Sequence, residues 1–149
     1  MRISTKGRYS LEALLYLALT EETREDQESF SSTREIAEKS GYSEGYLEQL
    51  FIPLRKAGLI QGVRGPQGGY YLAKPPEQIS AGDILRAVEG PLQPTACIDE
   101  EICPDAKACP SRRTWCALYE CIARTVDTIT LAELREAYKH DNAEPDYII

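Results

Sequence analysis

The sequence predicts a mainly α-helical protein with one small β-hairpin. Apolar residues recur at i, i+3, i+4 and i+7 in several segments, which is the spacing of a helix that buries one face. One stretch breaks this pattern, because "RGPQGG" at residues 64–69 separates two β-prone runs. With 149 residues and 42% hydrophobic side chains, the chain can form one domain, or two small ones, with a real core.

Two helices open the predicted fold. The first covers residues 9–19, and its apolar face contains Leu11, Leu14, Leu15, Ala18 and Leu19. A polar loop, 20–32, leads to a short second helix in which Ser32 or Thr33 is the N-cap and Gly41 the stop.

A third helix and the hairpin follow. The helix starts behind Ser43 and ends at Gly58, and its buried face contains Leu47, Leu50, Phe51 and Leu54. Pro53 lacks a backbone donor and is expected to kink or split this helix. Two strands are predicted at 59–63 and 70–73, with the glycine-rich loop between them as the hairpin tip.

The C-terminal half contains two further helical segments and a loop. Ser80 caps a short helix over 81–89. A cysteine-containing loop covers about 92–110, and a longer helix covers about 111–127. "TLAE" at 130–133 has the form of a capping box, so a last helix is expected to start there.

Charge is distributed unevenly along the chain. The net charge is −7, but residues 1–74 carry ten basic and ten acidic side chains, so the whole excess lies in residues 75–149. Local charge decides whether a surface binds phosphate, and a basic face is available on the neutral half. Its members would be Arg2, Lys6, Arg8, Arg55, Lys56 and Arg64.

Location and redox context follow from two further observations. No apolar run approaches the length that spans a bilayer, and Glu12 and the acidic block 21–28 do not fit a signal peptide, so we expect a cytoplasmic protein without membrane contact. Five cysteines cannot all pair within one chain, and clustered thiols in a cytoplasmic protein more often bind metal or respond to redox state.

The two short helices and the hairpin together predict a winged helix-turn-helix domain over residues 1–80. In such a domain the second helix of the motif enters the major groove of DNA with its N-terminal residues. These residues are Ser43, Glu44, Gly45, Tyr46, Glu48 and Gln49. Arg64 at the wing tip can reach a minor groove or a phosphate, and Gly65, Gly68 and Gly69 would permit close approach to the duplex. The alternatives are a winged helix used for protein contacts alone and, for Tyr46, a packed ring.

The second constellation is the stretch "CIDEEICPDAKACP", which spaces Cys97, Cys103 and Cys109 evenly. Zinc sites prefer closer cysteine pairs, whereas a loop with this spacing suits a larger iron–sulfur cluster. A disulfide and three ordinary thiols remain alternatives. A cluster normally takes four ligands, and Arg112, one helical turn past Cys109, cannot ligate. The candidates for the fourth ligand are Cys116, Asp99, Glu101, His140, a group from a partner subunit and an exogenous thiol.

The two constellations together resemble the family of winged-helix regulators that includes IscR, the iron–sulfur cluster regulator. The resemblance runs from Met1 to about Leu134. Its most specific stretches are "STKGRYSLEALLYLAL", "YLEQLF", "LRKAGLI", "VRGPQGGYYLAK" and C-x5-C-x5-C followed by "W".

The resemblance implies a homodimeric transcription factor that binds a palindromic operator, regulates iron–sulfur cluster biogenesis and exchanges clusters with donor proteins. The helix at about 111–127 would form most of the dimer interface within the unit 81–149. By the same resemblance the three evenly spaced cysteines hold a cluster, with 2Fe–2S favoured over 4Fe–4S. Ser43, Glu48, Gln49 and Arg64 match operator-reading positions, with Glu48 discriminating between site types, and Lys6 and Tyr46 match phosphate contacts.

The sequence departs from that family at the fourth ligand. The family pattern has histidine where this chain has Arg112, and other relatives use an acidic residue where this chain has Arg8. The rival interpretation is therefore a cluster-free regulator of the same fold that responds to thiol oxidation or to cysteine metabolism. A further alternative is an iron–sulfur carrier or redox protein. An enzyme is not expected, because no phosphate loop, nucleotide fingerprint or acid–base pair with histidine is present.

Overall fold

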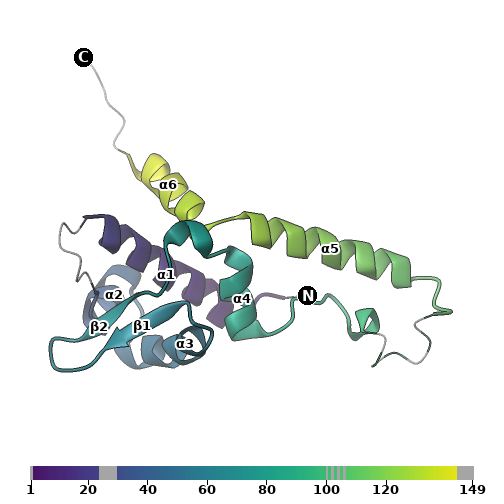
Figure 1. Cartoon of the computed structure of the whole chain (residues 1–149), viewed down its shortest axis with the longest axis horizontal. Coiled ribbons are helices and arrows are strands. Elements are labelled where there is room, and N and C mark those ends of the chain that lie inside the picture. The colour runs from purple at the N-terminus through teal and green to yellow at the C-terminus, as the bar shows by residue number, and fades with distance from the viewer. Residues whose placement is uncertain are drawn as a thin grey trace, which may run out of the picture.

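The predicted helices and hairpin are present in the computed structural model, which describes residues 2–23, 30–99, 101, 103, 105 and 107–143. Figure 1 shows α1 to α4 gathered with the hairpin, while α5 extends away from them. In chain order the elements are α1 (Thr5–Thr23), α2 (Thr33–Ser40), α3 (Glu44–Lys56), β1 (Ile60–Val63), β2 (Gly69–Leu72), η1 (Pro76–Gln78), α4 (Ala81–Glu89), η2 (Ala96–Ile98), α5 (Arg112–Thr128) and α6 (Leu131–Asn142).

One hydrophobic core lies between α1, α2, α3, the hairpin and α4. Its largest fully buried side chains include Phe51, Leu14, Leu47 and Ile84. The mainly α fold with a winged helix-turn-helix is therefore confirmed. Leu131, the first residue of α6, is also fully buried in this core. The division of the chain at residue 80 stays a prediction.

Capping residues fix where three of the helices begin. Ser32, Ser80 and Thr130 each accept a hydrogen bond from the backbone N–H three residues on, and the acidic side chain there accepts one from the cap's own N–H. Gly41 ends α2 with a φ of 76°, a left-handed conformation that favours glycine. The predicted helix starts are confirmed at these positions because the signals are local.

Pro53 does not split α3, so that part of the prediction is wrong. The helix runs without a break from Glu44 to Lys56. Proline removes only its own N–H, whose partner would be the carbonyl of Gln49, and the next turn still closes with Ala57 N–H donating to the Pro53 carbonyl at 2.9 Å. The buried side chains on both sides of the proline hold the helix in place; they are Leu50, Phe51 and Leu54.

Close backbone contacts shape the wing. β1 and β2 pair antiparallel, and Ser31 bridges to Tyr70 through two 2.8 Å hydrogen bonds on the outer edge of β2. A Cβ on Gly69 would lie 2.3 Å from the Ser31 carbonyl oxygen, and one on Gly68 would lie 2.0 Å from the Val63 carbonyl oxygen. These two glycines are therefore required by the protein's own packing.

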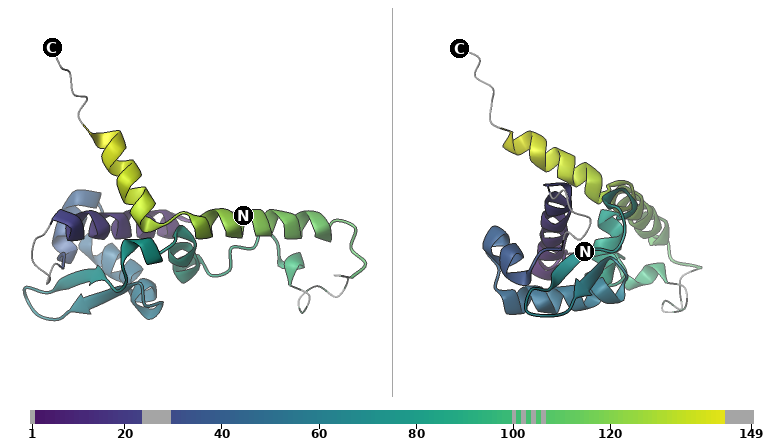
Figure 2. Two further views of the ribbon diagram at one scale, coloured as in Figure 1. Left: turned by 45° about the horizontal axis from the view of Figure 1, so that its top comes forward. Right: turned by 60° about the vertical axis from the view of Figure 1, so that its left-hand side comes forward.

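α5 is joined to the rest of the molecule near its C-terminal end. Arg86 of α4 makes two hydrogen bonds with the Asp127 carboxylate, at 2.6 and 2.9 Å, and this pair lies over Gly82. No residue of α5 is fully buried, and the left view in Figure 2 shows the helix projecting from the body. Within the described part of the chain, no helix is both long and apolar enough to cross a membrane.

Replacement of Gly69 tests the wing packing. Gly69→Ala should lower the free energy of unfolding by about 1–3 kcal/mol, because the new methyl group collides with backbone that cannot move aside. Gly45→Ala is the matched control, since nothing lies within 4 Å of its added Cβ, and it should be neutral or slightly stabilising. Urea unfolding followed by circular dichroism measures both, and equal midpoints would contradict the packing argument.

Candidate nucleic-acid interface and cysteine segment

The outer face of α3 carries the residues predicted to contact DNA. Glu48 and Gln49 are exposed, whereas Leu47 and Leu50 beside them are fully buried and anchor the helix. Within the part of the chain that the structure describes, the side chains of Glu48 and Gln49 make no hydrogen bond or ion pair. Their polar groups are therefore available to a partner.

Ser43 has a structural role at the start of α3. It is the N-cap, and its hydroxyl oxygen accepts a hydrogen bond from the Tyr46 backbone N–H at 3.3 Å. The residue is exposed, so its hydroxyl proton can still be donated to a phosphate or a base. The sequence indicated the contact role, and the structure adds the capping role.

Three tyrosine rings hold the turn between α2 and α3 against α1. The ring of Tyr9 stacks on Tyr42 with 3.9 Å between centroids and meets Tyr46 edge-on at 5.9 Å. The Tyr42 hydroxyl donates to the Glu12 carboxylate, and burial together with this bond raises the pKa of Tyr42. Tyr46 is thus partly packed, and its ring position is set by Tyr9.

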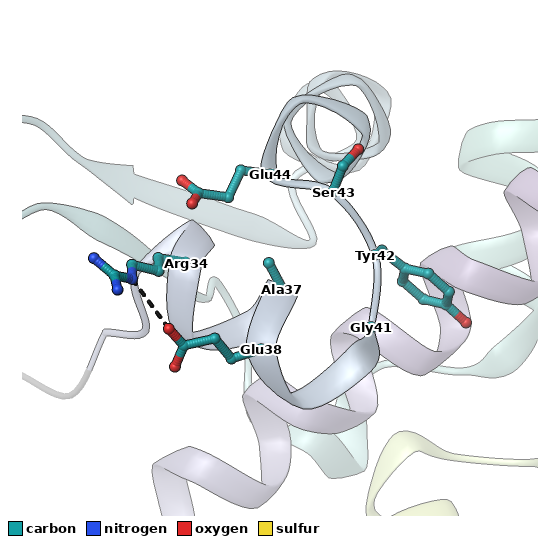
Figure 3. Close-up of a pocket in the computed structure, with 7 residues that line it drawn as sticks. All are labelled: Arg34, Ala37, Glu38, Gly41, Tyr42, Ser43 and Glu44. Atoms are coloured by element: carbon teal, nitrogen blue, oxygen red, sulfur yellow. Dashed lines mark hydrogen bonds and ion pairs between the residues drawn. The ribbon is translucent and has the colours of Figure 1, made fainter.

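A shallow pocket lies on the outer side of the same turn. Figure 3 shows the Arg34–Glu38 ion pair on α2 at one side and Ser43 and Glu44 at the start of α3 on the other, while Tyr42 points away toward α1. The ion pair measures 3.0 Å and is well exposed, so it contributes little to stability. All of the residues that line the pocket belong to α2, to the turn or to the first residue of α3.

Arg64 lies at the tip of the wing and is exposed. Gly65 follows it with a φ of 117°, a conformation that L side chains rarely adopt, and this turns the chain at the tip. Arg64 makes no ion pair with any residue that the structure describes. Its charge is therefore available to a partner, and the predicted contact with a phosphate or a narrow minor groove stays a prediction.

Lys6 lies on the first turn of α1, which is held by a residue distant in sequence. The Glu89 carboxylate accepts hydrogen bonds from Ser4 N–H at 2.9 Å, the Ser4 hydroxyl at 2.6 Å and Gly7 N–H at 3.2 Å. A carboxylate at a helix N-terminus satisfies free backbone donors and interacts favourably with the helix dipole. Local sequence patterns could not reveal this contact, because 82–85 residues separate the partners.

The cysteine segment contains three free thiols. Cys97 lies in η2, Cys109 lies just before α5, and Cys103 lies between them; all three are partly exposed. Among the described residues, no three cysteine, histidine or acidic side chains are close enough together to hold a metal ion. The donors suit a thiophilic metal or an iron–sulfur cluster. The segment would have to close for all three to ligate, so the cluster site stays a prediction.

Arg112 holds the two ends of this segment together. Its guanidinium donates to the Cys97 carbonyl at 3.5 Å and to the Ile98 carbonyl at 3.3 Å, so the first turn of α5 is tied to η2. The residue at the position of the family's histidine is therefore a backbone clamp. Sequence reasoning excluded it as a ligand but could not assign this role, which depends on a contact across the segment.

Cys109 is the thiol whose chemistry the structure perturbs. Its sulfur lies 3.3 Å from the Ser111 hydroxyl, and the Trp115 indole N–H donates to the same oxygen at 3.3 Å. Because indole nitrogen can only donate, the Ser111 oxygen accepts from Trp115 and its hydroxyl proton is free to point at the sulfur. The hydrogen bond from Ser111, followed by backbone N–H groups at the start of α5, lowers the pKa of Cys109.

The two remaining cysteines lie on opposite faces of α5. Cys116 follows Arg112 by four residues, so it shares the face that Arg112 turns toward η2. Cys121 follows Arg112 by nine residues, or two and a half turns, and is exposed on the other side. Only Cys116 therefore faces the cysteine segment, and it is half-buried.

Replacement of Ser111 tests the perturbation of Cys109. Ser111→Ala removes the main cause of the lowered pKa, so the pKa should rise and a smaller fraction of the thiol should be ionised at pH 7. Alkylation of Cys109 by iodoacetamide should then slow, and its midpoint should move to higher pH, as followed by peptide mass spectrometry on reduced protein. Cys121 in the same sample is the control, and Ser111→Thr should restore the profile. An unshifted midpoint would contradict this account.

Sequence relatives of the chain are transcriptional regulators. A family model described as Rrf2, an iron-dependent transcriptional regulator, matches residues 3–137. The regulator CymR of Bacillus subtilis is 40% identical over 134 residues, which cover 90% of this chain and 89% of CymR. IscR of Serratia proteamaculans is 41% identical over 134 residues, which cover 90% of this chain and 79% of IscR.

Solved structures of such regulators share the fold. CymR, described as the global cysteine regulator of B. subtilis, aligns with a TM-score of 0.73 and 38% identity, covering 92% of this chain and 98% of its own. IscR of T. potens aligns with a TM-score of 0.75 and 36% identity, and the alignment covers 99% of this chain and 95% of IscR. The resemblance to IscR-like regulators is confirmed, and the chain belongs to the Rrf2 family of transcriptional regulators.

Proposed function

We propose that this protein is a homodimeric regulator that binds a palindromic DNA operator through α3 and the wing. The proposal rests on one observation: the outer face of α3 carries exposed polar side chains, in a chain that belongs to a family of transcriptional regulators. Glu48 and Gln49 are exposed there and unpaired within the described chain, and Arg64 stands free at the wing tip. Hydrogen-bonding side chains on an exposed recognition helix are what direct readout of base edges requires.

The dimer interface is proposed to lie on α5. This helix presents a half-exposed apolar stripe that the described residues leave uncovered, and Leu118 within it is 46% exposed. The stripe contains Trp115, Leu118 and Ile122 at helical spacing. A second copy of α5 would cover it and place two recognition helices on one face of the duplex, as a palindromic operator demands.

An iron–sulfur cluster on Cys97, Cys103 and Cys109 is proposed to control operator binding. Closing the segment around a cluster would act on α5 through Arg112 and on α4 through residues 90–95, which connect α4 to η2. α4 and α5 would set the separation of the two α3 helices in the dimer. That separation must match the distance between the two half-sites of the operator, which is strict. A coupling of about 1–3 kcal/mol would change affinity roughly 5- to 150-fold. Control of cluster biogenesis genes is the proposed output.

A cluster-free regulator of cysteine metabolism is the second candidate. CymR is as similar to this chain as IscR is, and Arg112 stands where a fourth ligand would be needed. In this reading the perturbed Cys109 thiol is the sensor. Visible absorbance of anaerobically purified protein separates the two candidates, because only the first requires a coloured cluster.

DNA binding can be tested at the wing. The full-length protein would be used to enrich binding duplexes from a random-sequence library, and affinity for a selected duplex would be measured by fluorescence anisotropy at several salt concentrations. Arg64→Ala should weaken binding and reduce the slope of log K against log salt by about one, because one phosphate or groove contact is lost. Arg124→Ala removes an equal charge from the exposed side of α5 and is the control. Equal losses in both variants would contradict a specific role for the wing.

Cluster binding can be tested by counting iron and sulfide after anaerobic reconstitution. About two of each per chain would indicate a 2Fe–2S cluster and about four a 4Fe–4S cluster. Cys97→Ala should abolish binding. Cys116→Ser should change the absorbance or lower the iron content if this thiol is the fourth ligand, whereas Cys121→Ser, on the opposite face, should match the unmodified protein. An absence of iron in the unmodified protein would favour the cluster-free candidate.

A further inference from the structure

One apolar side chain lies on the same face of α3 as the residues proposed to read DNA. Ile52 is 60% exposed on α3. It follows Glu48 by four residues and Gln49 by three, so the three share one face of the helix. Helical side chains tilt toward the N-terminus, so Ile52 leans toward these two polar residues.

Ile52 is not one of the α3 residues that pack into the hydrophobic core. The core contacts of α3 are made by Leu47, Leu50, Phe51 and Leu54, which lie on the opposite face. Isoleucine is also a weaker helix former than alanine, because its branched side chain loses rotamer freedom in a helix. A single exposed aliphatic residue is ordinary on a protein surface, but this one lies about one helical turn beyond two side chains that would enter the major groove, on their face of α3.

Base edges in the major groove offer one apolar partner. Thymine carries a C5-methyl group there, whereas the other groups at the base edges are hydrogen-bond donors or acceptors. Resting on the proposed function, we propose that Ile52 contacts a thymine methyl in each half-site and thereby selects thymine at that position. Glu48 and Gln49 would read neighbouring bases by hydrogen bonding, and Ile52 would add apolar readout beside them.

Deoxyuridine provides a direct test, because it differs from thymidine in this methyl group alone. Duplexes enriched from a random library by the full-length protein would have each thymine of the half-site replaced singly by deoxyuridine. At one position the replacement should weaken binding of the unmodified protein about fourfold, the value of one buried methyl group. The Ile52→Ala variant should bind the thymine duplex about fourfold more weakly than the unmodified protein does. It should bind the thymine duplex and the deoxyuridine duplex equally well, because the apolar partner of the methyl group is already gone.

Controls separate the inference from the proposed function. Ile52→Val keeps a branched apolar side chain and should retain most of the thymine preference, and Ile52→Ala should fold normally, because the side chain is exposed and alanine favours helices. If duplexes are enriched but no thymine couples to Ile52, or the half-site contains no thymine, the inference fails and DNA binding stands. If no duplex is enriched at all, the proposed function fails and the inference falls with it.

Discussion

The backbone of residues 79–81 pairs with that of residues 129–131, and this short antiparallel bridge determines how α5 leaves the body. Ala81 N–H donates to the Ile129 carbonyl and Leu131 N–H to the Ile79 carbonyl, both at 2.8 Å. The Arg86–Asp127 pair on Gly82 adds a side-chain contact beside it. Because α5 buries none of its own residues completely, its direction depends on this junction. α4 and α5 flank the cysteine segment in the chain, so these two helices connect it to the rest of the molecule.

The winged helix-turn-helix uses its apolar and polar residues on different faces of the same helices. α3 contributes four buried apolar side chains inward and keeps its hydrogen-bonding side chains outside. Around it, the tyrosine cluster holds the turn before the helix, and Ser31 holds the base of the wing. These contacts position the turn and the wing beside α3, whose polar side chains lie on its outer face.

The cysteine segment is built differently from the DNA-binding body. Its residues 97–109 contribute no buried apolar side chain among those that the structure describes, and its ends are joined by the hydrogen bonds of Arg112. A segment without a core of its own gains order chiefly from what it binds. Its three thiols are partly exposed, and Arg112 stands where the IscR pattern has histidine.

The sequence by itself determined the elements and the buried and exposed faces of α3. Helix starts at Ser32, Ser80 and Thr130, the glycine-rich wing and the buried face of α3 all follow from patterns within a few residues, because caps and periodicity are local. The split that Pro53 predicted in α3 is absent, because the packing of the buried side chains around it stabilises the helix more than one missing hydrogen bond destabilises it. Only the tertiary structure decided that Glu89 caps α1, that Arg112 clamps Cys97, and that Ser111 and Trp115 act on Cys109. The first two contacts join segments that the fold brings together, and the third depends on side-chain directions around the start of α5, so none could be read from the order of residues alone.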